Sequence, residues 1–323
     1  MKNPTPIASL VRDYVPGELI SVPGIYRNVP MDVYQGQCCI GPSISSGGVR
    51  TIDSKNPKIF YRDWSGNPNR KEKKEVAHFG FGRAVHHLAA GETAFAEQFR
   101  VRPTEWDSWR TGDAKKWRAA QELAKFTVLT PEDVEAIRGV AASLNEHPTI
   151  MAGILQGLIE HSIFWKDWKT GVWLKARPDV IPVDSAMIVD LKTAADASAI
   201  SCRRSIADFG YHIQMAMIDA GLQATANFRA DAFVDLFVEK DDPWCINHKP
   251  ISAFAMQRGH QQLRRGVDGF AWCLKNDQWP GYDDDEVEAE LPKWYLDRLK
   301  YEEEHGLLPK FSECFPSAED EAI

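Results

Sequence analysis

The stretch from Asp179 to Lys192 combines acidic and basic residues at spacings that suit metal-assisted chemistry. Asp190 and Lys192 lie two residues apart within an apolar run, and side chains two apart on a strand point to the same face. Asp179, at the end of the preceding segment, can reach Asp190 across a hairpin. Two carboxylates that converge repel each other unless a cation or a proton lies between them. Oxygen ligands without thiolates favour a hard cation such as Mg²⁺, for which Mn²⁺ can substitute.

The reaction that fits these residues is metal-assisted hydrolysis of a phosphodiester. Asp179 and Asp190 would hold Mg²⁺, and the backbone carbonyl of Leu191 is a candidate third ligand. The metal would lower the pKa of bound water and neutralise charge in the transition state. Lys192 would orient the attacking water or stabilise the developing charge. Spacing alone leaves an alternative open, because a D…DxK pattern is short and also describes an ordinary salt bridge at a sheet edge.

Periodicity of the apolar residues predicts the elements that must position these groups. Helical spacing predicts helices over 74–91, 113–126, 131–145, 203–222 and 252–275. Alternation of apolar and polar residues predicts strands over 159–168, 172–179, 186–193, 227–239 and 244–248. Residues 169–171 form the predicted hairpin turn between the first two strands. This order predicts an α/β (α+β) core with helical additions.

Composition and charge narrow the class of protein. The chain has 323 residues, of which 44% are hydrophobic and 26% charged, as in globular proteins. No apolar run approaches the ~18 residues of a membrane span, and the N-terminus has no secretory signal. The net charge of −8 argues against binding nucleic acid through an entirely basic surface, but allows a local basic groove. Six cysteines without a CxxC pair predict reduced thiols in a cytoplasmic protein, and no zinc or iron–sulfur framework.

Five short motifs follow one another along the chain. They are Gly82-Arg83-Ala84-Val85-His86, Glu160, Arg177-Pro178-Asp179, Asp190-Leu191-Lys192 and Tyr211-His212-Ile213-Gln214. This series resembles the PD-(D/E)xK nuclease superfamily, whose RecB-like branch reads G-x-x-x-H, E, D, D-x-K and Q-x-x-x-Y in that order. The resemblance implies a restriction-endonuclease-like core, in which helices flank a central mixed β-sheet.

Other phrases resemble one branch of that superfamily in particular. They lie at 84–88, 177–179, 279–282 and 291–294, and they are similar to the RecE-type (exonuclease VIII-like) phage and prophage exonucleases. The resemblance covers about residues 20 to 300. We therefore expect an N-terminal arm over 1–40, irregular apart from at most one short strand, a nuclease domain over 41–300 and an acidic tail over 301–323.

The resemblance also implies roles for single residues. His86 would be a metal ligand or a contact to the scissile phosphate, and Glu160 would complete the metal shell directly or through water. Gln214 would position the site or the DNA backbone. The family pattern ends in Tyr four residues after this Gln, where the chain has Ile218. Tyr211 precedes Gln214 by three residues, shares its helix face and is the candidate replacement.

Candidate DNA contacts are the basic and aromatic residues beside these motifs: Lys175, Arg177, Arg203, Arg204 and Tyr211. Phosphate contacts carry no sequence information, which suits an enzyme that digests any duplex. A solvated strand or helix face is the alternative for each basic residue. His86 could likewise be a structural helix residue, Glu160 a surface acid and Gln214 a polar helix residue.

The function that the resemblance implies is a Mg²⁺-dependent exonuclease that acts on linear double-stranded DNA. It would degrade one strand in the 5′-to-3′ direction, and the 3′ overhang would pass to a single-strand annealing protein of RecT type for recombination. A ring-shaped homo-oligomer, a phage or prophage gene and the cytoplasm of a bacterial host are the accompanying expectations. Two alternatives stay open: an endonuclease of the same superfamily, and an inactive DNA-binding or assembly module with the same fold.

Overall fold

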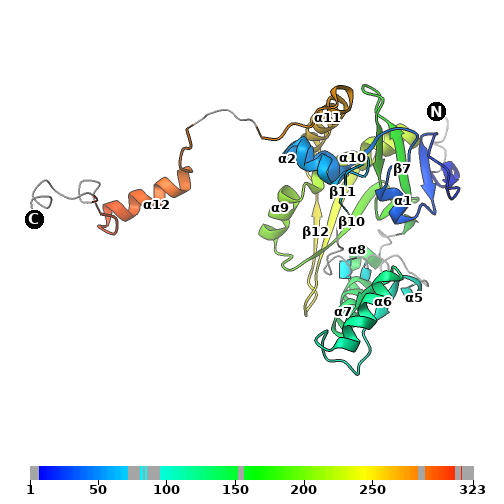
Figure 1. Cartoon of the computed structure of the whole chain (residues 1–323), viewed down its shortest axis with the longest axis horizontal. Coiled ribbons are helices and arrows are strands. Elements are labelled where there is room, and N and C mark those ends of the chain that lie inside the picture. Colours follow the sequence, from blue (N-terminus) through cyan, green and yellow to red (C-terminus); the bar gives the residue numbers. More distant parts are fainter. Residues whose placement is uncertain are drawn as a thin grey trace, which may run out of the picture. The chain divides into compact units, whose positions relative to one another are not determined.

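The structure is a computed structural model that describes residues 7–71, 81–82, 84–85, 95–151, 156–282, 288–309 and 314. The chain divides into two compact units, Met1–Gly281 and Tyr282–Ile323, and each is described by itself. The first unit is a mixed α/β assembly of β-sheets and packed helices (Figure 1). It contains every described residue of the predicted site.

A five-stranded sheet carries the predicted hairpin. Its strands, in spatial order, are β1 (Val11–Asp13), β2 (Gly24–Arg27), β7 (Ser162–Lys166), β8 (Trp173–Ala176) and β3 (Ser43–Ser45). β7 and β8 pair antiparallel, and Gly171 in the turn between them has φ +74°, a conformation that glycine adopts without strain. The expectation of an irregular N-terminal segment with at most one short strand is wrong, because β1 and β2 both extend this sheet. Strands of three or four residues are too short to show a pattern in the sequence, and β2 joins the sheet by pairing with β7, a distant part of the chain.

A three-stranded sheet carries the central acidic motif. It contains β10 (Met187–Ala194), β11 (Ala232–Glu239) and β12 (Ile246–Pro250), with β10 parallel to β11 and β12 antiparallel to it. A separate antiparallel pair, β6 (Gly157–Ile159) and β9 (Val180–Pro182), lies beside β10 through β9. The predicted strands over 186–193, 227–239 and 244–248 are therefore confirmed, with later starts for the last two.

The connection from β10 to β11 runs through two helices, although the sequence predicted one over 203–222. They are α9 (Ala199–Asp208) and α10 (Tyr211–Ala226). Gly210 separates them with φ +63°, which interrupts the helix and starts α10 afresh at Tyr211. Helical periodicity continues across the break, and for that reason the sequence pattern did not reveal it.

Helices α10, α11 (Ala253–Asn276) and α2 (Ser46–Ser54) pack together beside the five-stranded sheet (Figure 1). Two glycines of α11 permit the close approach. A Cβ at Gly259 would lie 2.4 Å from the carbonyl oxygen of His212, and one at Gly266 would lie 2.9 Å from that of Val49. α11 confirms the helix predicted over 252–275.

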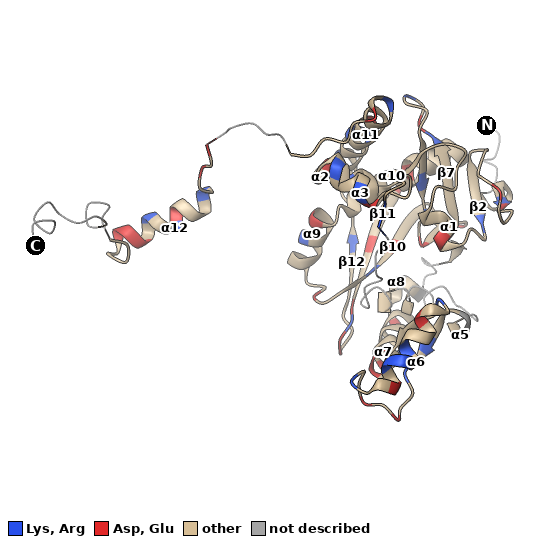
Figure 2. Cartoon of the chain, in the orientation of Figure 1, with Lys and Arg blue, Asp and Glu red and all other residues tan. Residues whose placement is uncertain are grey.

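A second layer of helices covers the other face of β10 and β11. Its main helix is α7 (Pro131–Glu146), which begins with a capping box between Thr130 and Asp133. Its apolar face packs on Val189 and Leu191 of β10 and on their counterparts in β11. α6 (Gly112–Leu123) precedes it, and Lys and Arg residues gather on α6 (Figure 2). The helices predicted over 113–126 and 131–145 are confirmed.

The remaining elements are short. They are a 3₁₀ turn η1 (Ile7–Leu10), α1 (Met31–Gln35), α3 (Pro57–Asp63), α5 (Phe95–Gln98), α8 (Pro148–Met151) and the parallel pair β4 (Phe99–Val101) and β5 (Thr127–Leu129). Of the helix predicted over 74–91, residues 81–82 and 84–85 are described and helical. The rest of it lies outside the described residues.

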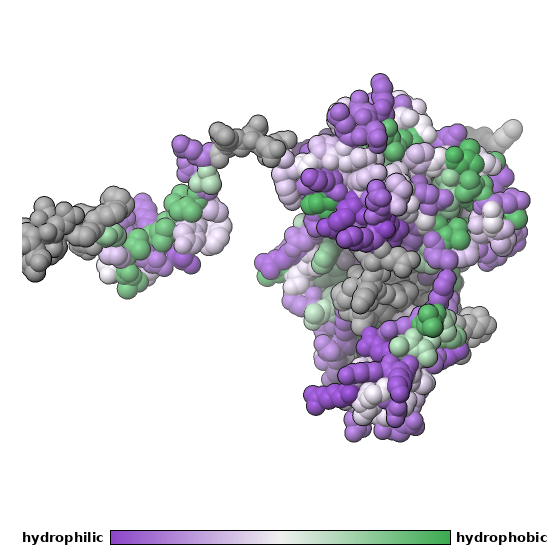
Figure 3. All heavy atoms as spheres, viewed as in Figure 1, coloured by the Kyte–Doolittle hydropathy of each residue, from purple (hydrophilic) through white to green (hydrophobic). Residues whose placement is uncertain are grey.

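The second unit has one described helix, α12 (Lys293–Glu304). Trp294, Tyr301 and neighbouring leucines of this segment are exposed, and Figure 3 shows hydrophobic residues among the hydrophilic ones along it. None of the described helices is both long and apolar enough to cross a membrane.

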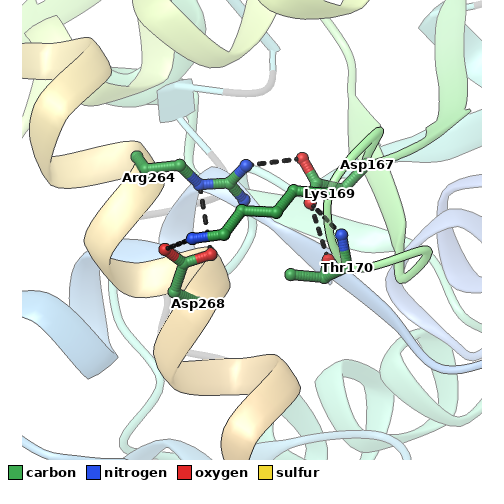
Figure 4. A network of polar contacts seen from close by, with 5 residues as sticks. All are labelled: Asp167, Lys169, Thr170, Arg264 and Asp268. Carbon is green, nitrogen blue, oxygen red and sulfur yellow. Dashed lines mark hydrogen bonds and ion pairs between the residues drawn. The ribbon is translucent and has the colours of Figure 1, made fainter.

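A polar network joins the β7–β8 turn to α11 (Figure 4). Asp167 accepts hydrogen bonds from the backbone and hydroxyl of Thr170 at 2.8 and 2.7 Å and pairs with Arg264 at 2.9 Å. Lys169 pairs with Asp268 at 2.7 Å. Burial acts to raise the pKa of Asp167, but the hydrogen bonds from Arg264 and Thr170 outweigh it and hold the pKa below its ordinary value. The network fixes the hairpin against the helix.

Replacing Asp167 by Ala is expected to lower the free energy of unfolding by about 3 kcal/mol, because the turn loses its acceptor and Arg264 loses a buried partner. Urea unfolding of the metal-free protein measures this. Lys169→Ala is the control, since it breaks a pair whose Lys169 side chain is 52% exposed, and it is expected to cost less than about 1 kcal/mol. Equal losses of unfolding free energy for the two variants would contradict the role of Asp167 in fixing the hairpin.

Candidate active site

The two predicted metal-binding carboxylates meet where β9 lies beside β10. Asp190 occupies the middle of β10 and is 1% exposed. Asp179 immediately precedes β9, and its Oδ2 accepts a hydrogen bond from the backbone nitrogen of Leu191 at 2.6 Å. The N–H and C=O of a strand residue point to the same side, so the Leu191 carbonyl also faces the side of Asp179. Asp179 is thus held against the residue that follows Asp190.

Lys192 and Gln214 enclose the carboxyl group of Asp190. The ammonium group of Lys192 forms an ion pair with Asp190 Oδ2 and donates to Gln214 Oε1 at 2.9 Å. The amide nitrogen of Gln214 donates to Asp190 Oδ1 at 2.9 Å. These three contacts form a closed ring between β10 and the first turn of α10. Asp190 and Lys192 project from the same strand face, as the sequence predicted.

Tyr211 covers the ammonium group from the start of α10. Lys192 Nζ lies 4.1 Å from the centroid of the Tyr211 ring, a cation–π contact. Ile218, at the position where the family pattern has Tyr, is 1% exposed within the core and faces away from solvent. Tyr211, three residues before Gln214, therefore supplies the aromatic ring in the site.

Charge around Lys192 keeps it protonated. Burial acts to lower the pKa of this ammonium group, but Asp190, Asp235 and Asp179 together outweigh burial and raise the pKa above its ordinary value. Burial also raises the pKa of the Tyr211 hydroxyl, which Lys192 partly offsets. Without a metal, Lys192 is thus positively charged, and an ammonium group suits a phosphate oxygen.

A third carboxylate, Asp235, was missed by the sequence reasoning. It lies on β11 in register with Asp190, is 0% exposed, and neither of its oxygens has a hydrogen-bond partner among the described residues. Burial raises its pKa to about 7; Lys192 opposes this rise, and Asp190 and Asp179 add to it. The sequence held one signal, because Val189-Asp190-Leu191 and Val234-Asp235-Leu236 repeat the same tripeptide in two apolar strands.

Glu160 and His86 are the other predicted ligands. Glu160 lies in the turn between β6 and β7 with φ +49°, and its backbone nitrogen donates to the carbonyl of Asp179 at 2.9 Å. Its backbone therefore borders the site, and the residue is exposed. His86 lies outside the described residues. Gly82, in the same motif, approaches β10, since a Cβ there would lie 3.4 Å from Thr193 Oγ1.

Lys175 and Arg177 lie in a different environment from the one expected of DNA contacts. Lys175 is 4% exposed and donates to the carbonyls of Tyr34 and Gly36 at 2.7 and 2.6 Å. Arg177 donates to the carbonyl of Val29 at 2.7 Å and to the Ser162 hydroxyl at 2.8 Å. Burial lowers the pKa of both groups. Both cations therefore hold the N-terminal segment against the five-stranded sheet.

Arg203 and Arg204 are exposed on α9, the helix that leads into Gly210 and Tyr211. Two other residues link this region to α2 and α11. Arg50 donates to the carbonyl of Phe209, and His212 contacts Gln262 at 2.7 Å. Of the predicted DNA contacts, Arg203 and Arg204 are thus exposed, and Tyr211 is half-buried over Lys192.

The donor chemistry of the cluster fits a hard divalent cation. Within the described part of the chain, no three His, Cys, Asp or Glu side chains lie close enough together to hold a metal ion. Asp179 and Asp190 nevertheless supply carboxylate oxygens and Leu191 a carbonyl, which are the ligands that Mg²⁺ prefers. Asp235 is buried in register with Asp190 and becomes negatively charged only near pH 7, because burial raises its pKa. A cation here would relieve the mutual repulsion of these carboxylates.

Fold and site together define a PDDEXK-like domain. A family model described as "PDDEXK-like domain of unknown function (DUF3799)" matches residues 64–289. The chain therefore belongs to this family. The predicted PD-(D/E)xK fold, an α/β core with helices around a mixed central sheet, is confirmed, and the match agrees with the resemblance to RecE-type nucleases.

Solved structures are similar to this chain at low sequence identity, and the first of them shares its fold. A "Putative exonuclease" from Eubacterium rectale superposes with a TM-score of 0.57 and 12% identity, over 84% of this chain and 98% of that one. A phage-related exonuclease from Haemophilus somnus 129PT has a TM-score of 0.34 and 10% identity, over 74% of this chain and 97% of that one. No curated protein matches the sequence.

The raised pKa of Asp235 predicts a measurable dependence of stability on pH. The unfolded chain releases this proton near pH 4, whereas the folded protein keeps it up to about pH 7. Between these values the folded state binds more protons, so this residue makes the free energy of unfolding fall as pH rises, by about 1 kcal/mol per pH unit. Asp235→Asn cannot ionise and should remove that contribution.

Urea unfolding in the presence of a chelator, across this pH window, measures the difference between the two proteins. The advantage of Asp235→Asn should be absent at the acidic end and grow towards neutral pH. Asp208→Asn, at an exposed position on α9, is the control and should show no such trend. A pH-independent difference for Asp235→Asn would contradict the raised pKa.

Proposed function

We propose that this protein is a Mg²⁺-dependent deoxyribonuclease that hydrolyses double-stranded DNA from its ends. The observation that carries the proposal is the ring of contacts among Asp190, Lys192 and Gln214, with Asp179 held against the same strand. Together they offer two carboxylates for a cation and one positive charge beside them. This combination suits metal-assisted phosphodiester hydrolysis.

Each residue of the proposed site has a distinct role. Asp179, Asp190 and the Leu191 carbonyl would hold the metal, with His86 and Glu160 completing its shell. The metal, when bound, supplies a water of lowered pKa and neutralises charge on the phosphate. Lys192 would stabilise the same charge or orient the water, and Gln214 keeps both Asp190 and Lys192 in place. Tyr211 would limit the movement of the ammonium group by covering it.

DNA binding must come from local basic surfaces, because the whole chain carries a net charge of −8. Arg203 and Arg204 on α9 are the proposed phosphate contacts nearest to Tyr211 in the chain. Lys115 and Lys116 are exposed on α6, where Figure 2 shows a concentration of basic residues. Such contacts bind the backbone of any sequence, which suits digestion without sequence preference.

The finer features of the proposal rest on the resemblance to RecE-type enzymes. These features are digestion in the 5′-to-3′ direction, a 3′ overhang, transfer of that overhang to an annealing protein of RecT type and a ring-shaped homo-oligomer. The name of the structural neighbour with a TM-score of 0.57 contains the word exonuclease, which agrees with action from DNA ends. Phage or prophage origin and action in the bacterial cytoplasm belong to the same set of inferences.

Asp190→Asn is expected to lower Mg²⁺-dependent cleavage of linear duplex DNA by at least about 10²-fold, because the metal loses a charged ligand. The assay uses duplexes labelled at the 5′ or the 3′ end, with closed circular DNA in parallel. The wild type should release short products from the 5′ label first and leave closed circles intact. Asp219→Asn, at another largely buried aspartate of the first unit, is the matched control and should keep its activity.

Each alternative function gives a different result in this assay. Cutting of closed circles would indicate an endonuclease of the same fold. Binding of DNA without any cleavage in Mg²⁺ or Mn²⁺ would indicate an inactive DNA-binding or assembly module. Full activity of Asp190→Asn would refute the assigned site.

A further inference from the structure

Asp235 has no role in the chemistry proposed so far, although it is buried beside the site. Its carboxyl group is 0% exposed and neither oxygen has a hydrogen-bond partner within the described residues. Such a group is costly to bury unless a positive charge or a hydrogen bond compensates it. The cross-strand neighbour on β12, Lys249, is in register with Asp235, but within the described part of the chain it forms no ion pair with it. Asp235 therefore lacks the partner that its burial requires.

Lys192 is the cation whose field acts on Asp235. The register partner of Lys192 on β11 is Phe237, so Asp235 is its diagonal neighbour on the same strand face. Long side chains reach diagonal neighbours across paired strands. In this structure the ammonium group instead pairs with Asp190 Oδ2.

A divalent cation at Asp190 would change this arrangement. It would compete with the ammonium group for the same carboxylate and repel it, because both are positive. Three carboxylates act on the charge of Lys192: Asp190, Asp235 and Asp179. On the proposed function, Asp179 and Asp190 both hold the metal, which leaves Asp235 to balance the lysine.

We propose that Asp235 is a positioning residue that takes over the ammonium group of Lys192 when a divalent cation binds Asp190. The lysine exchanges one carboxylate partner for the next along the strand face. It thereby stops competing with the metal and stays charged beside the site. This inference rests on the proposed metal-dependent function and assigns to Asp235 no direct contact with the metal.

The closing experiment is a double-mutant cycle read by Mn²⁺ binding without DNA. The four proteins are the wild type, Asp235→Asn, Lys192→Met and the double variant. Electron paramagnetic resonance of free Mn²⁺ gives the dissociation constants. Asp235→Asn is expected to weaken Mn²⁺ binding about tenfold, within the usual range of coupling between sites, because Lys192 then stays on Asp190.

The same substitution made in the Lys192→Met protein should change Mn²⁺ binding by less than about twofold, the usual error of additivity. Lys192→Met alone should bind Mn²⁺ at least as tightly as the wild type, since the competing ammonium group is gone. Asp235→Glu keeps the charge and should stay closer to the wild type than Asp235→Asn. Asp219→Asn is the control for loss of a largely buried carboxylate elsewhere.

The outcomes separate the inference from the proposed function. Equal weakening by Asp235→Asn with and without Lys192 would make Asp235 a metal ligand and overturn the inference. No weakening in either background would overturn it as well. Weaker Mn²⁺ binding by Lys192→Met alone would also do so, even if the asparagine variant failed to fold. Absence of Mn²⁺ binding by the wild type would instead refute the metal-dependent function on which the inference rests.

Discussion

The pairing of a buried carboxyl group, Asp190, with a buried ammonium group, Lys192, is the interaction on which the site depends. Removing two charged groups from water costs several kcal/mol for each, and only close pairing and further hydrogen bonds offset that cost. Gln214 supplies those hydrogen bonds to both partners at once. The start of α10 must therefore lie over the middle of β10. The interruption at Gly210 follows from this requirement, because a continuous helix from α9 would not begin a new first turn at Tyr211.

The surrounding architecture keeps β10 in place on both faces and along both edges. Apolar residues of one face pack on α7 and its neighbours, and those of the other face join the core beneath α10. β11 pairs with it in parallel, and β9 carries Asp179 to its other side. The charged residues thus emerge from a strand that cannot shift without disturbing both cores. A metal-binding site needs this rigidity, since its ligands must be held in the binding geometry before the cation arrives.

Positive charge in this protein serves two purposes that the sequence does not distinguish. Lys192 faces the acidic cluster, whereas Lys175 and Arg177 face the N-terminal segment and bind its carbonyls. Lys175 and Arg177 therefore serve the fold of the N-terminal segment instead of the surface where DNA contacts were expected. These contacts also help to hold together a sheet in which β1, β2 and β3 come from the N-terminal part of the chain and β7 and β8 from its middle.

The sequence by itself determined what depends on local spacing. Alternation placed Asp190 and Lys192 on one strand face, the turn residues predicted the β7–β8 hairpin, and Thr130-Pro131 marked the start of α7. The order of five motifs further predicted the PD-(D/E)xK fold. Tertiary structure alone decided which strands become neighbours. The register that sets Asp235 beside Asp190, the sheet positions of β1 and β2 and the partners of Lys175 and Arg177 all join distant segments. Periodicity reports which face of an element is apolar, but only packing decides what that face meets.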